Sequence, residues 1–418
     1  MNFTKVITIL FLNFSFLFSF SQPVEIPWPE IVDSSDLVDT RSKPIEYQVK
    51  QIFRIPEKGV SADNMFPGAR LNDMFMINDS TLQVQILPEN HPVNMSPWYA
   101  FRMWSETNQT IYLKLCYKHG QHRYWPKLSS DNNYWIPVDS SDYFSEPGDT
   151  SALFRVHLKL DTISISAQEN IGSDECKRWI DKLGEKQFIS RHTIGYSTLG
   201  RPLYGLSISE SDGKNLLIIL SRQHPPEITG YKEMVAFVES ISENTRLSRK
   251  FRKKFETIVV PMMNPDGVDN GFWRHNAGGI DMNRDWRHFN QPETFAFRKY
   301  ILEKVRKQNA IVCFGIDFHS TQEDIFYYSE KNVNPDKENI ALEWANSINQ
   351  LFPDNSFNPE ATGITSQISK NWFFNEIKAE SITYEVGDNT PRDIINKRGK
   401  EAARQLMKIL LKDRKNCR

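Results

Sequence analysis

The sequence has little cysteine, almost no net charge and, beyond its N-terminal residues, no long apolar run. Four cysteines among 418 residues match neither a disulfide framework nor a zinc knuckle in their spacing. After the N-terminus, no stretch is long and apolar enough to span a bilayer as a helix. With 51 basic and 52 acidic residues the net charge is -1, so the overall balance favours neither nucleic acid nor an anionic membrane surface as a partner.

The N-terminal residues carry the one apolar run of this kind. Lys5 precedes an apolar stretch from Val6 to Phe20, and small serines lie at its end. This order is typical of a secretory signal peptide, and the apolar stretch is short for a membrane span of about 20 residues. We expect residues 1–21 to be a cleaved signal peptide and the mature protein to be exported, either periplasmic or secreted. An uncleaved membrane anchor is the alternative.

The rest of the chain divides into two parts with different patterns. In residues 22–165, short apolar or aromatic runs alternate with turn residues, which predicts a β-sandwich domain. Its expected strands lie within 46–55, 82–87, 98–104, 110–117 and 152–160. Its aromatic residues fit a core or a domain interface better than a sugar-binding platform; they are Trp98, Tyr99, Trp104, Tyr124, Trp125, Tyr134 and Trp135.

In residues 170–415, apolar runs of strand length alternate with patterns of helical spacing. This alternation predicts an α/β domain with helices on both faces of its sheet. The expected strands are 203–208, 216–220, 257–260, 311–318 and 381–385, and the expected helices are 231–243, 292–308, 336–351 and 397–412. A further helix is expected to open near Ser173, with this serine as its N-cap.

Potential metal ligands follow two of the expected strands. Five apolar residues, Leu216 to Leu220, predict a buried strand, and His224 and Glu227 follow it in a turn stiffened by two prolines. The run Ile311 to Phe318 leads directly to His319. Open α/β sheets bind ligands at the carboxyl ends of their strands, so the three side chains are expected at one edge of the sheet. Two histidines and one glutamate with an open position match the ligand set of a hydrolytic zinc site.

A site of this kind also needs a base and groups that hold an anion. The metal polarises the scissile carbonyl and lowers the pKa of its bound water toward ~7, and a second carboxylate must take the proton. Glu385, at the end of a later strand, is the expected general base. The polar, glycine-rich loop from Pro261 to Trp286 offers Arg274, Asn283 and Arg284 as donors to an anion. Surface arginines without a partner are the alternative.

Six short motifs occur in the order found in the zinc carboxypeptidase superfamily. They are H-P-P-E (224–227), N-P-D-G-V (264–268), W-R-H-N (273–276), G-I-D-M-N-R-D-W (279–286), D-F-H-S (317–320) and T-Y-E (383–385). The chain resembles this superfamily over roughly residues 172–412, and its cytosolic-carboxypeptidase-like branch most of all. Members of that branch carry a β-sandwich ahead of the catalytic domain, which F-P-G-A-R-L-N-D (66–73) and W-Y-A-F-R-M (98–103) resemble. The resemblance implies an α/β/α sandwich with a mixed, mostly parallel central sheet.

The resemblance also implies a catalytic role for each site residue. His224, Glu227 and His319 would hold one Zn²⁺ ion. Glu385 would activate the attacking water and later protonate the leaving amine, and Arg274 would stabilise the oxyanion. The chain would therefore be a zinc metallocarboxypeptidase that removes a C-terminal residue by means of a metal-activated water.

Substrate recognition is implied in the same way. Asn283 and Arg284 would bind the terminal carboxylate, so the partner would be a peptide or peptide-like chain with a free C-terminus. A gap-free count back from Glu385 places Lys370 on the floor of the specificity pocket, where a cation would favour terminal Glu or Asp. A lysine that points to solvent is the alternative. The same count places Gly363 where relatives carry a mobile tyrosine, so either that hydroxyl is missing or the alignment slips.

Three other functions stay open at this point. A hydrolase of cell-wall peptides, acting at bonds between Glu and diamino acids, would use the same fold. An N-acyl amino acid deacylase also uses H-x-x-E and a later histidine, but the motif series together with Glu385 favours the peptidase. An inactive binding protein predicts the loss of a ligand or of the base, whereas this sequence retains all of them.

Overall fold

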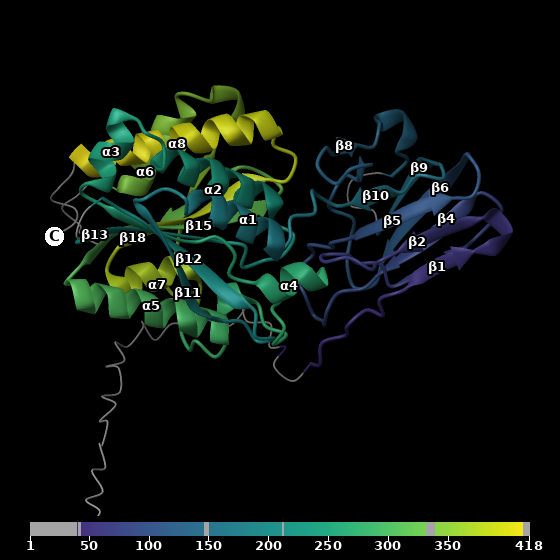
Figure 1. Cartoon of the computed structure of the whole chain (residues 1–418), viewed down its shortest axis with the longest axis horizontal. Helices are drawn as coiled ribbons and strands as arrows, with labels where there is room; N and C mark the ends of the chain where they lie inside the picture. The colour runs from purple at the N-terminus through teal and green to yellow at the C-terminus, as the bar shows by residue number, and fades with distance from the viewer. Residues whose placement is uncertain (1–39, 41–42, 146–149, 211–212, 332–338, 413–418) are drawn as a thin grey trace, which may run out of the picture.

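A computed structural model of the chain describes residues 40, 43–145, 150–210, 213–331 and 339–412. The expected signal peptide, residues 1–21, lies outside this part of the chain. Figure 1 shows two parts side by side, a β-rich part and an α/β part. None of the helices within the described ranges is long and apolar enough to cross a membrane.

Short strands with alternating burial build the first part. The strands are β1 (Ile52–Ile55), β2 (Val60–Asp63), β3 (Asp73–Met76), β4 (Thr81–Ile86), β5 (Ala100–Ser105), β6 (Gln109–Tyr117), β7 (Lys127–Ser129), β8 (Ile136–Pro137), β9 (Ser151–Leu158) and β10 (Ile163–Ser166). Every second side chain of β4 and β9 faces the interior, because successive side chains of a strand point to opposite faces. The strands form two sheets, β1-β2-β5-β10-β7-β8 and β3-β4-β6-β9, whose inner faces share one apolar core. This is the expected β-sandwich.

The sandwich departs from the sequence prediction in detail rather than in kind. Each of the five expected segments contains a strand, and the strands pair antiparallel except for β4 and β6, which run parallel. Trp98, Tyr99 and Tyr124 are buried in the core, as expected for aromatic residues with a structural role. Tyr134 is exposed.

An eight-stranded sheet carries the second part. Its strands are β11 (Ile189–Tyr196), β12 (Pro202–Ile208), β13 (Asn215–Ser221), β14 (Glu256–Val260), β15 (Ile311–Thr321), β16 (Ile325–Ser329), β17 (Asn358–Thr362) and β18 (Glu380–Gly387). They lie in the order β11-β12-β14-β13-β15-β18-β16-β17. The central strands β14, β13, β15 and β18 are parallel, and antiparallel pairings join β11, β12 and β16. The expectation of a mixed, mostly parallel sheet is confirmed.

Helices cover both faces of this sheet. They are α1 (Ser173–Leu183), α2 (Ile228–Ile241), α3 (Arg246–Arg252), α4 (Pro265–Asn270), α5 (Pro292–Gln308), α6 (Ile340–Asn349), α7 (Ser369–Trp372) and α8 (Arg392–Lys412). In Figure 1, α2, α6 and α8 lie on one face, and α5 and α7 on the other. The helix expected near Ser173 begins there, but its N-cap is Gly172, because the Ser173 hydroxyl donates to Asp269 Oδ2 instead (2.6 Å).

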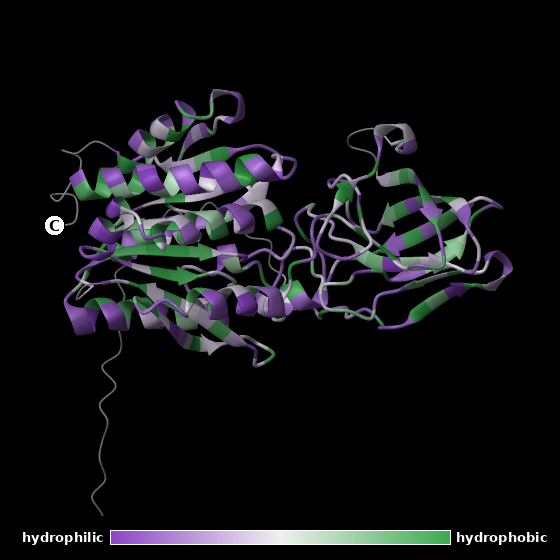
Figure 2. Ribbon diagram, turned by 45° about the horizontal axis from the view of Figure 1, so that its top comes forward, coloured by the Kyte–Doolittle hydropathy of each residue, from purple (hydrophilic) through white to green (hydrophobic). Residues whose placement is uncertain are grey.

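The apolar run of β13 explains how the sheet is held between its helices. Leu217 and Ile219 belong to a core shared with α2 and α8, whereas Leu216, Ile218 and Leu220 belong to a core shared with α5 and Trp372 of α7. A central strand must be apolar on both faces, and five successive apolar residues meet that need. Figure 2 shows apolar residues on the strands of this sheet and polar residues on the outer surfaces of the helices.

Candidate metal centre

Three sequence-predicted ligands meet at the carboxyl edge of the sheet. His224 lies in the loop after β13, and Glu227 is the last residue before α2. His319 lies near the end of β15, the neighbouring parallel strand. The first turn of α2 packs directly against this strand, since a Cβ on Gly230 would lie 2.0 Å from the His319 carbonyl oxygen. The local fold therefore brings Glu227 within reach of both histidines.

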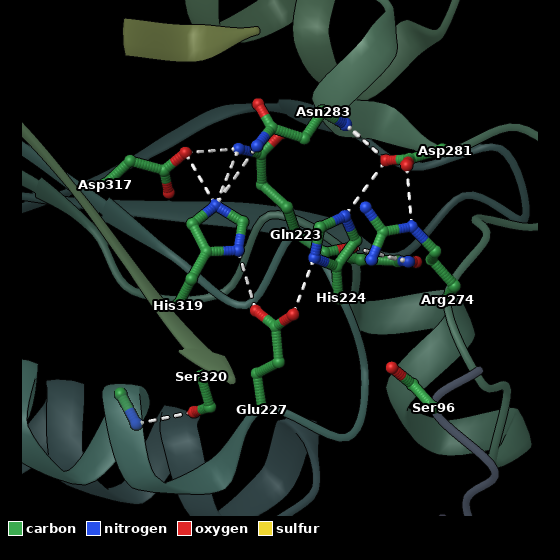
Figure 3. A network of polar contacts seen from close by, with 12 residues as sticks. Ser96, Gln223, His224, Glu227, Arg274, Asp281, Asn283, Asp317, His319 and Ser320 are labelled. Carbon is green, nitrogen blue, oxygen red and sulfur yellow. Dashed lines mark hydrogen bonds and ion pairs between the residues drawn. The ribbon is translucent and has the colours of Figure 1, made fainter. Parts of the chain in front are cut away.

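The carboxylate of Glu227 lies between the two imidazole rings. Its Oε1 is 2.7 Å from His224 Nδ1 and its Oε2 is 2.7 Å from His319 Nδ1 (Figure 3). One ligand atom from each of the three residues lies within 4.8 Å of the others, and all three side chains are buried. The two Nδ1 atoms and the carboxylate thus converge on one point.

The other nitrogen of each ring contacts a second carboxylate. His224 Nε2 is 2.9 Å from Asp281 Oδ1, and His319 Nε2 is 2.8 Å from Asp317 Oδ2. A carboxylate at the outer nitrogen fixes the tautomer and the orientation of a metal-ligating histidine. Sequence reasoning did not assign Asp281 or Asp317 a role, although both lie inside the quoted motifs G-I-D-M and D-F-H-S.

The electrostatics of this cluster favour positive charge. Burial raises the pKa of Glu227, but the charges of His224 and His319 hold it well below its usual range. Burial lowers the pKa of His319, yet Asp317 and Glu227 raise it well above its usual value. Carboxylates around two imidazoles suit a divalent cation, and a histidine, glutamate and histidine set suits zinc. The residues present therefore fit a zinc ion held by His224, Glu227 and His319.

Glu385 lies beside the cluster on β18. In the register of β15 and β18 it is the direct partner of His319, so both side chains leave the sheet at the same level. Burial raises the pKa of the Glu385 carboxyl to about 7, and its Oε2 atom is buried with no hydrogen-bond partner among the residues that the structure describes. An unpaired buried oxygen costs free energy unless something occupies the site, so this atom is placed to accept a proton from a bound molecule.

The loop after β14 contributes Arg274, Asn283 and Arg284. Arg274 Nε donates to Asp281 Oδ2 (2.6 Å), the same carboxylate that contacts His224. Asn283 is buried, with its Nδ2 3.4 Å from His319 Nε2, and Arg284 Nη1 donates to the Asn283 carbonyl (2.9 Å). The structure thus brings this loop to the predicted metal ligands.

Lys370 does not point to solvent. It lies on α7 with 0% of its surface exposed, and its Nζ donates to Ser329 Oγ (3.2 Å) and Asn371 Oδ1 (2.9 Å). Burial lowers the pKa of Lys370 to about 7. The start of the same helix is tied to Asn283, whose Oδ1 accepts from the Ser369 amide (2.9 Å).

A tyrosine lies near Glu385, the predicted base. It comes from β16 and not from the segment around Gly363, to which the gap-free count pointed. Gly363 follows β17, and within the described part of the chain no atom lies within 4 Å of a Cβ built on it. Tyr327 lies on β16, two residues from Ile325, the register partner of Glu385. Side chains two residues apart share a face of a strand, and burial and the charge of Glu385 raise the pKa of Tyr327. Sequence alone gave no signal for it, because the pairing of β16 with β18 is a tertiary contact.

The sandwich also reaches this edge of the sheet. Arg123, from the loop between β6 and β7, donates through Nε to Asp388 Oδ2 (2.7 Å) and through Nη2 to the Ser320 carbonyl (3.2 Å). Ser320 follows His319, and Asp388 follows the strand of Glu385. Sequence analysis gave this arginine no role, since its partners lie 197 and 265 residues away.

Fold and site together define a class of protein, the α/β metallohydrolases with a histidine, glutamate and histidine set at the carboxyl edge of the sheet. The sequence profile described as "Zinc carboxypeptidase" matches residues 176–404. This is more than half of the chain, and the chain belongs to the zinc carboxypeptidase family. The family resemblance seen in the six motifs is therefore confirmed.

Individual relatives agree with this assignment. Cytosolic carboxypeptidase 3 of Bos taurus is 32% identical over 143 residues, which cover 34% of this chain and 14% of that protein. Cytosolic carboxypeptidase 2 of Homo sapiens is 28% identical over 160 residues, which cover 36% of this chain and 18% of that protein. The chain thus spans less than a fifth of the length of these two relatives.

Solved structures share the fold over both parts of the chain. A metallo-carboxypeptidase from Burkholderia cenocepacia superimposes with a TM-score of 0.67 at 18% identity, covering 84% of this chain and 98% of that chain. A metallo-carboxypeptidase from Pseudomonas aeruginosa, in complex with (2-guanidinoethylmercapto)succinic acid, gives a TM-score of 0.67 at 17% identity, covering 85% of this chain and 100% of that chain. At these identities the likeness concerns the fold alone.

Proposed function

We propose that this protein is a zinc-dependent carboxypeptidase that removes the C-terminal residue of peptides with the help of one zinc ion. The observation that carries the proposal is that the three predicted ligands and the predicted base lie at the same edge of the sheet. The Glu227 carboxylate lies between the Nδ1 atoms of His224 and His319, and the unpaired oxygen of Glu385 belongs to the register partner of His319. This combination supplies three metal ligands and a separate base.

Glu385 is the group that moves the proton. A bound zinc ion would polarise the scissile carbonyl and lower the pKa of the attacking water. The carboxylate of Glu385 takes one proton from this water and gives it to the leaving amine. Its raised pKa, about 7, suits both steps, because a group that must accept and then donate works best near the ambient pH.

The loop after β14 holds the substrate. Arg274 donates to the oxyanion that develops on the scissile carbonyl, and the carboxylate of Asp281 holds the guanidinium in place (2.6 Å). Asn283 and Arg284 bind the terminal carboxylate, which restricts cleavage to the end of a chain. Arg284 is half-buried, and a guanidinium can donate two parallel hydrogen bonds to one carboxylate.

Lys370 selects an acidic terminal side chain, Glu or Asp. Its helix begins at Ser369, whose amide donates to Asn283, so Lys370 lies one residue from a group that contacts the carboxylate-binding asparagine. A buried ammonium without a carboxylate in hydrogen-bond contact is costly. Its Nζ donates to a hydroxyl and to an amide oxygen, and a substrate carboxylate would bring a negative charge into direct contact with it.

The place of action and the division of the chain are part of the same proposal. The N-terminal sequence pattern supports export, to the periplasm or the medium, after cleavage of residues 1–21. The two separate sets of sheets support a sandwich domain over 22–165 and a catalytic domain over 170–415.

Purified mature protein provides the test. We expect about one zinc per chain by metal analysis, and release of single C-terminal residues from a peptide mixture that stops when a chelator is added. Glu385→Gln keeps the zinc but lowers kcat by at least about 10²-fold, because the proton-transfer group is lost. The matched control Glu343→Gln, on the exposed side of α6, leaves kcat unchanged. A fully active, zinc-loaded Glu385→Gln protein would overturn the assignment of the base.

A further inference from the structure

The loop that follows β4 in the sandwich is buried against the α/β part. Its residues Glu89 and Asn90 are 0% and 2% exposed. Both contact the segment Trp273–Gly279, about 185 residues further along the chain. That segment carries Arg274, so the sandwich touches the substrate-binding loop directly.

The carboxylate of Glu89 accepts three successive backbone N–H groups. Its Oε2 accepts from the Trp273 amide (2.7 Å), and its Oε1 accepts from the amides of Arg274 (2.9 Å) and His275 (2.6 Å). Buried backbone donors in a segment without regular structure need partners from elsewhere, and here a side chain of the other domain provides them. The buried Arg70 guanidinium lies close enough for its charge to interact with that of Glu89.

Asn90 and the side chain of Trp273 provide further contacts between the sandwich and this segment. The Asn90 Oδ1 accepts from His275 Nδ1 (2.6 Å), and its Nδ2 donates to the Gly279 carbonyl (3.1 Å). Trp273 is fully buried within the sandwich core. Its ring packs edge-on against Tyr117, with 6.4 Å between centroids. Three sets of contacts with the sandwich therefore hold this segment, namely those of Glu89, of Asn90 and of the Trp273 ring.

These contacts end at the metal ligands. Arg274 is held at its backbone N–H by Glu89 and at its side chain by Asp281, which in turn contacts His224 Nε2. A continuous series of hydrogen bonds thus runs from the sandwich through Arg274 to a predicted zinc ligand. Every step is a charge-assisted contact between buried or partly buried groups, and such contacts are short and directional.

We propose that Glu89 is a positioning residue of the catalytic centre, through which the sandwich holds Arg274 in the place that oxyanion stabilisation requires. This inference rests on the proposed role of Arg274. Glu89 does not touch the substrate; it acts by fixing the backbone of the residue that does. Without it, Arg274 keeps its contact with Asp281 but loses the fixed backbone from which it extends.

A double-mutant cycle tests the proposal in the full-length mature enzyme. Glu89→Gln keeps one acceptor oxygen, but its amide N–H group opposes a backbone donor. We expect this variant to lower kcat by about 10-fold to 10²-fold with KM within about twofold, as for an interaction made in the transition state. Arg274→Gln lowers kcat by about 10²-fold to 10³-fold. The double variant has the kcat of Arg274→Gln alone, because Glu89 acts through that arginine.

Controls separate positioning from general stability. Asp63→Asn removes another buried sandwich carboxylate, one that accepts from the Met65 amide and from Arg102; it lowers the melting temperature and leaves kcat unchanged. Zinc content is measured in every variant. If Glu89→Gln does not fold, Asn90→Ala enters the same cycle, with an expected loss in kcat of about tenfold.

The results distinguish a failure of the positioning role of Glu89 from a failure of the proposed role of Arg274. A folded, zinc-loaded Glu89→Gln enzyme with unchanged kcat, or losses that multiply in the double variant, would overturn the positioning role and leave the proposed function intact. An Arg274→Gln enzyme with wild-type kcat would overturn the oxyanion role of Arg274, and the positioning role with it.

Discussion

The two histidines of the metal centre use their ring nitrogens in the same way, although they lie on different elements. Each presents Nδ1 to Glu227 and Nε2 to an aspartate, Asp281 for His224 and Asp317 for His319. A proton held on Nε2 by a carboxylate leaves Nδ1 free to bind a metal. The sequence identified the ligands through their residue types, but the choice of nitrogen depends on partners that it did not single out.

Lys370 is the side chain for which the structure removes an ambiguity. The sequence allowed either a solvent-exposed lysine or a pocket residue, and its full burial excludes exposure. A buried lysine loses charge easily, because the low-dielectric interior disfavours the ammonium form. If Lys370 pairs with the substrate, the preference for an acidic terminal residue is therefore expected to depend on pH.

We predict that the preference for a terminal Glu over a terminal Phe declines in alkaline solution. The pKa of Lys370 is lowered to about 7, so the ammonium that pairs with a substrate carboxylate is present below this pH and lost above it. The measurement is kcat/KM for two peptides that differ only in the last residue, because this ratio reports the free enzyme. The Glu-to-Phe ratio falls by up to about tenfold per pH unit above the pKa.

The matched variant is Lys370→Met, which keeps the length of the side chain and removes the charge. Its Glu-to-Phe ratio is low and independent of pH. Lys186→Met, which removes a lysine that donates to the Ser242 carbonyl (2.8 Å), leaves both the ratio and its pH dependence unchanged. A wild-type enzyme that prefers Phe at every pH would refute the acidic pocket.

Among the elements, the contact between α2 and β15 determines whether the metal ligands meet. Glu227 ends the loop before α2, His319 lies on β15, and Gly230 lets the helix backbone approach the strand. A Cβ at this position would lie 2.0 Å from the His319 carbonyl oxygen and 2.6 Å from its carbonyl carbon. Glycine is thus required by a close approach of two backbones rather than by a turn.

We predict that Gly230→Ala lowers the free energy of unfolding by about 1–3 kcal/mol, as expected for overpacking against a rigid backbone. Alanine is otherwise the better helix former, by up to about 1 kcal/mol, so the sign of the effect tests the contact. Urea unfolding of the metal-free protein measures it. Because α2 must move away from His319, zinc affinity also falls.

Gly363→Ala is the control for this substitution. No atom of the described residues lies within 4 Å of a Cβ at Gly363, so the free energy of unfolding is expected to stay within about 0.5 kcal/mol of the wild-type value. A stabilised Gly230→Ala protein would contradict the close approach of α2 to the His319 carbonyl.

The two parts of the chain are joined by buried contacts around the candidate metal centre. The sandwich core includes Trp273, the neighbour of Arg274, and Arg123 of the sandwich donates to Ser320 and Asp388 around the candidate metal centre. Interfaces between domains of one chain are often polar and permit motion. Here a tryptophan and a buried carboxylate cross the boundary, which favours a fixed arrangement.

We predict that residues 170–415 alone do not form a stable, active domain. Removing the sandwich takes away the packing of Trp273, whose loss is expected to cost about 3–5 kcal/mol. This is a large share of the about 5–15 kcal/mol that stabilises a typical protein. Circular dichroism and urea unfolding of the fragment, compared with a chain that lacks residues 1–21 alone, measure the effect. A fragment with the same unfolding midpoint and kcat as the longer chain would contradict the prediction.

The sequence by itself determined the kinds of most elements and which residues are candidate ligands. Apolar runs such as Leu216 to Leu220 have few ways to be buried other than as a central strand, so β13, β14, β15 and β18 could be predicted with nearly their observed ends. The strands β11 and β17 were not predicted, because their mostly exposed or half-buried side chains follow no clear apolar pattern. The strand β16 was not predicted either, although Ile325 to Tyr328 form a short apolar and aromatic run. Motifs in a fixed order predicted His224, Glu227 and His319 as ligands and Glu385 as the base, because each of these residues lies next to a recognisable strand or turn.

The contacts between distant segments were decided by the tertiary structure. Asp281 and His224 are 57 residues apart, and Glu89 and Arg274 are 185 apart. Local patterns encode which residues face a core, but they do not encode which polar group of another element a given backbone amide will meet. The burial of Lys370 and the support of Arg274 by the sandwich both depend on such encounters, which exist once the two parts of the chain have packed together.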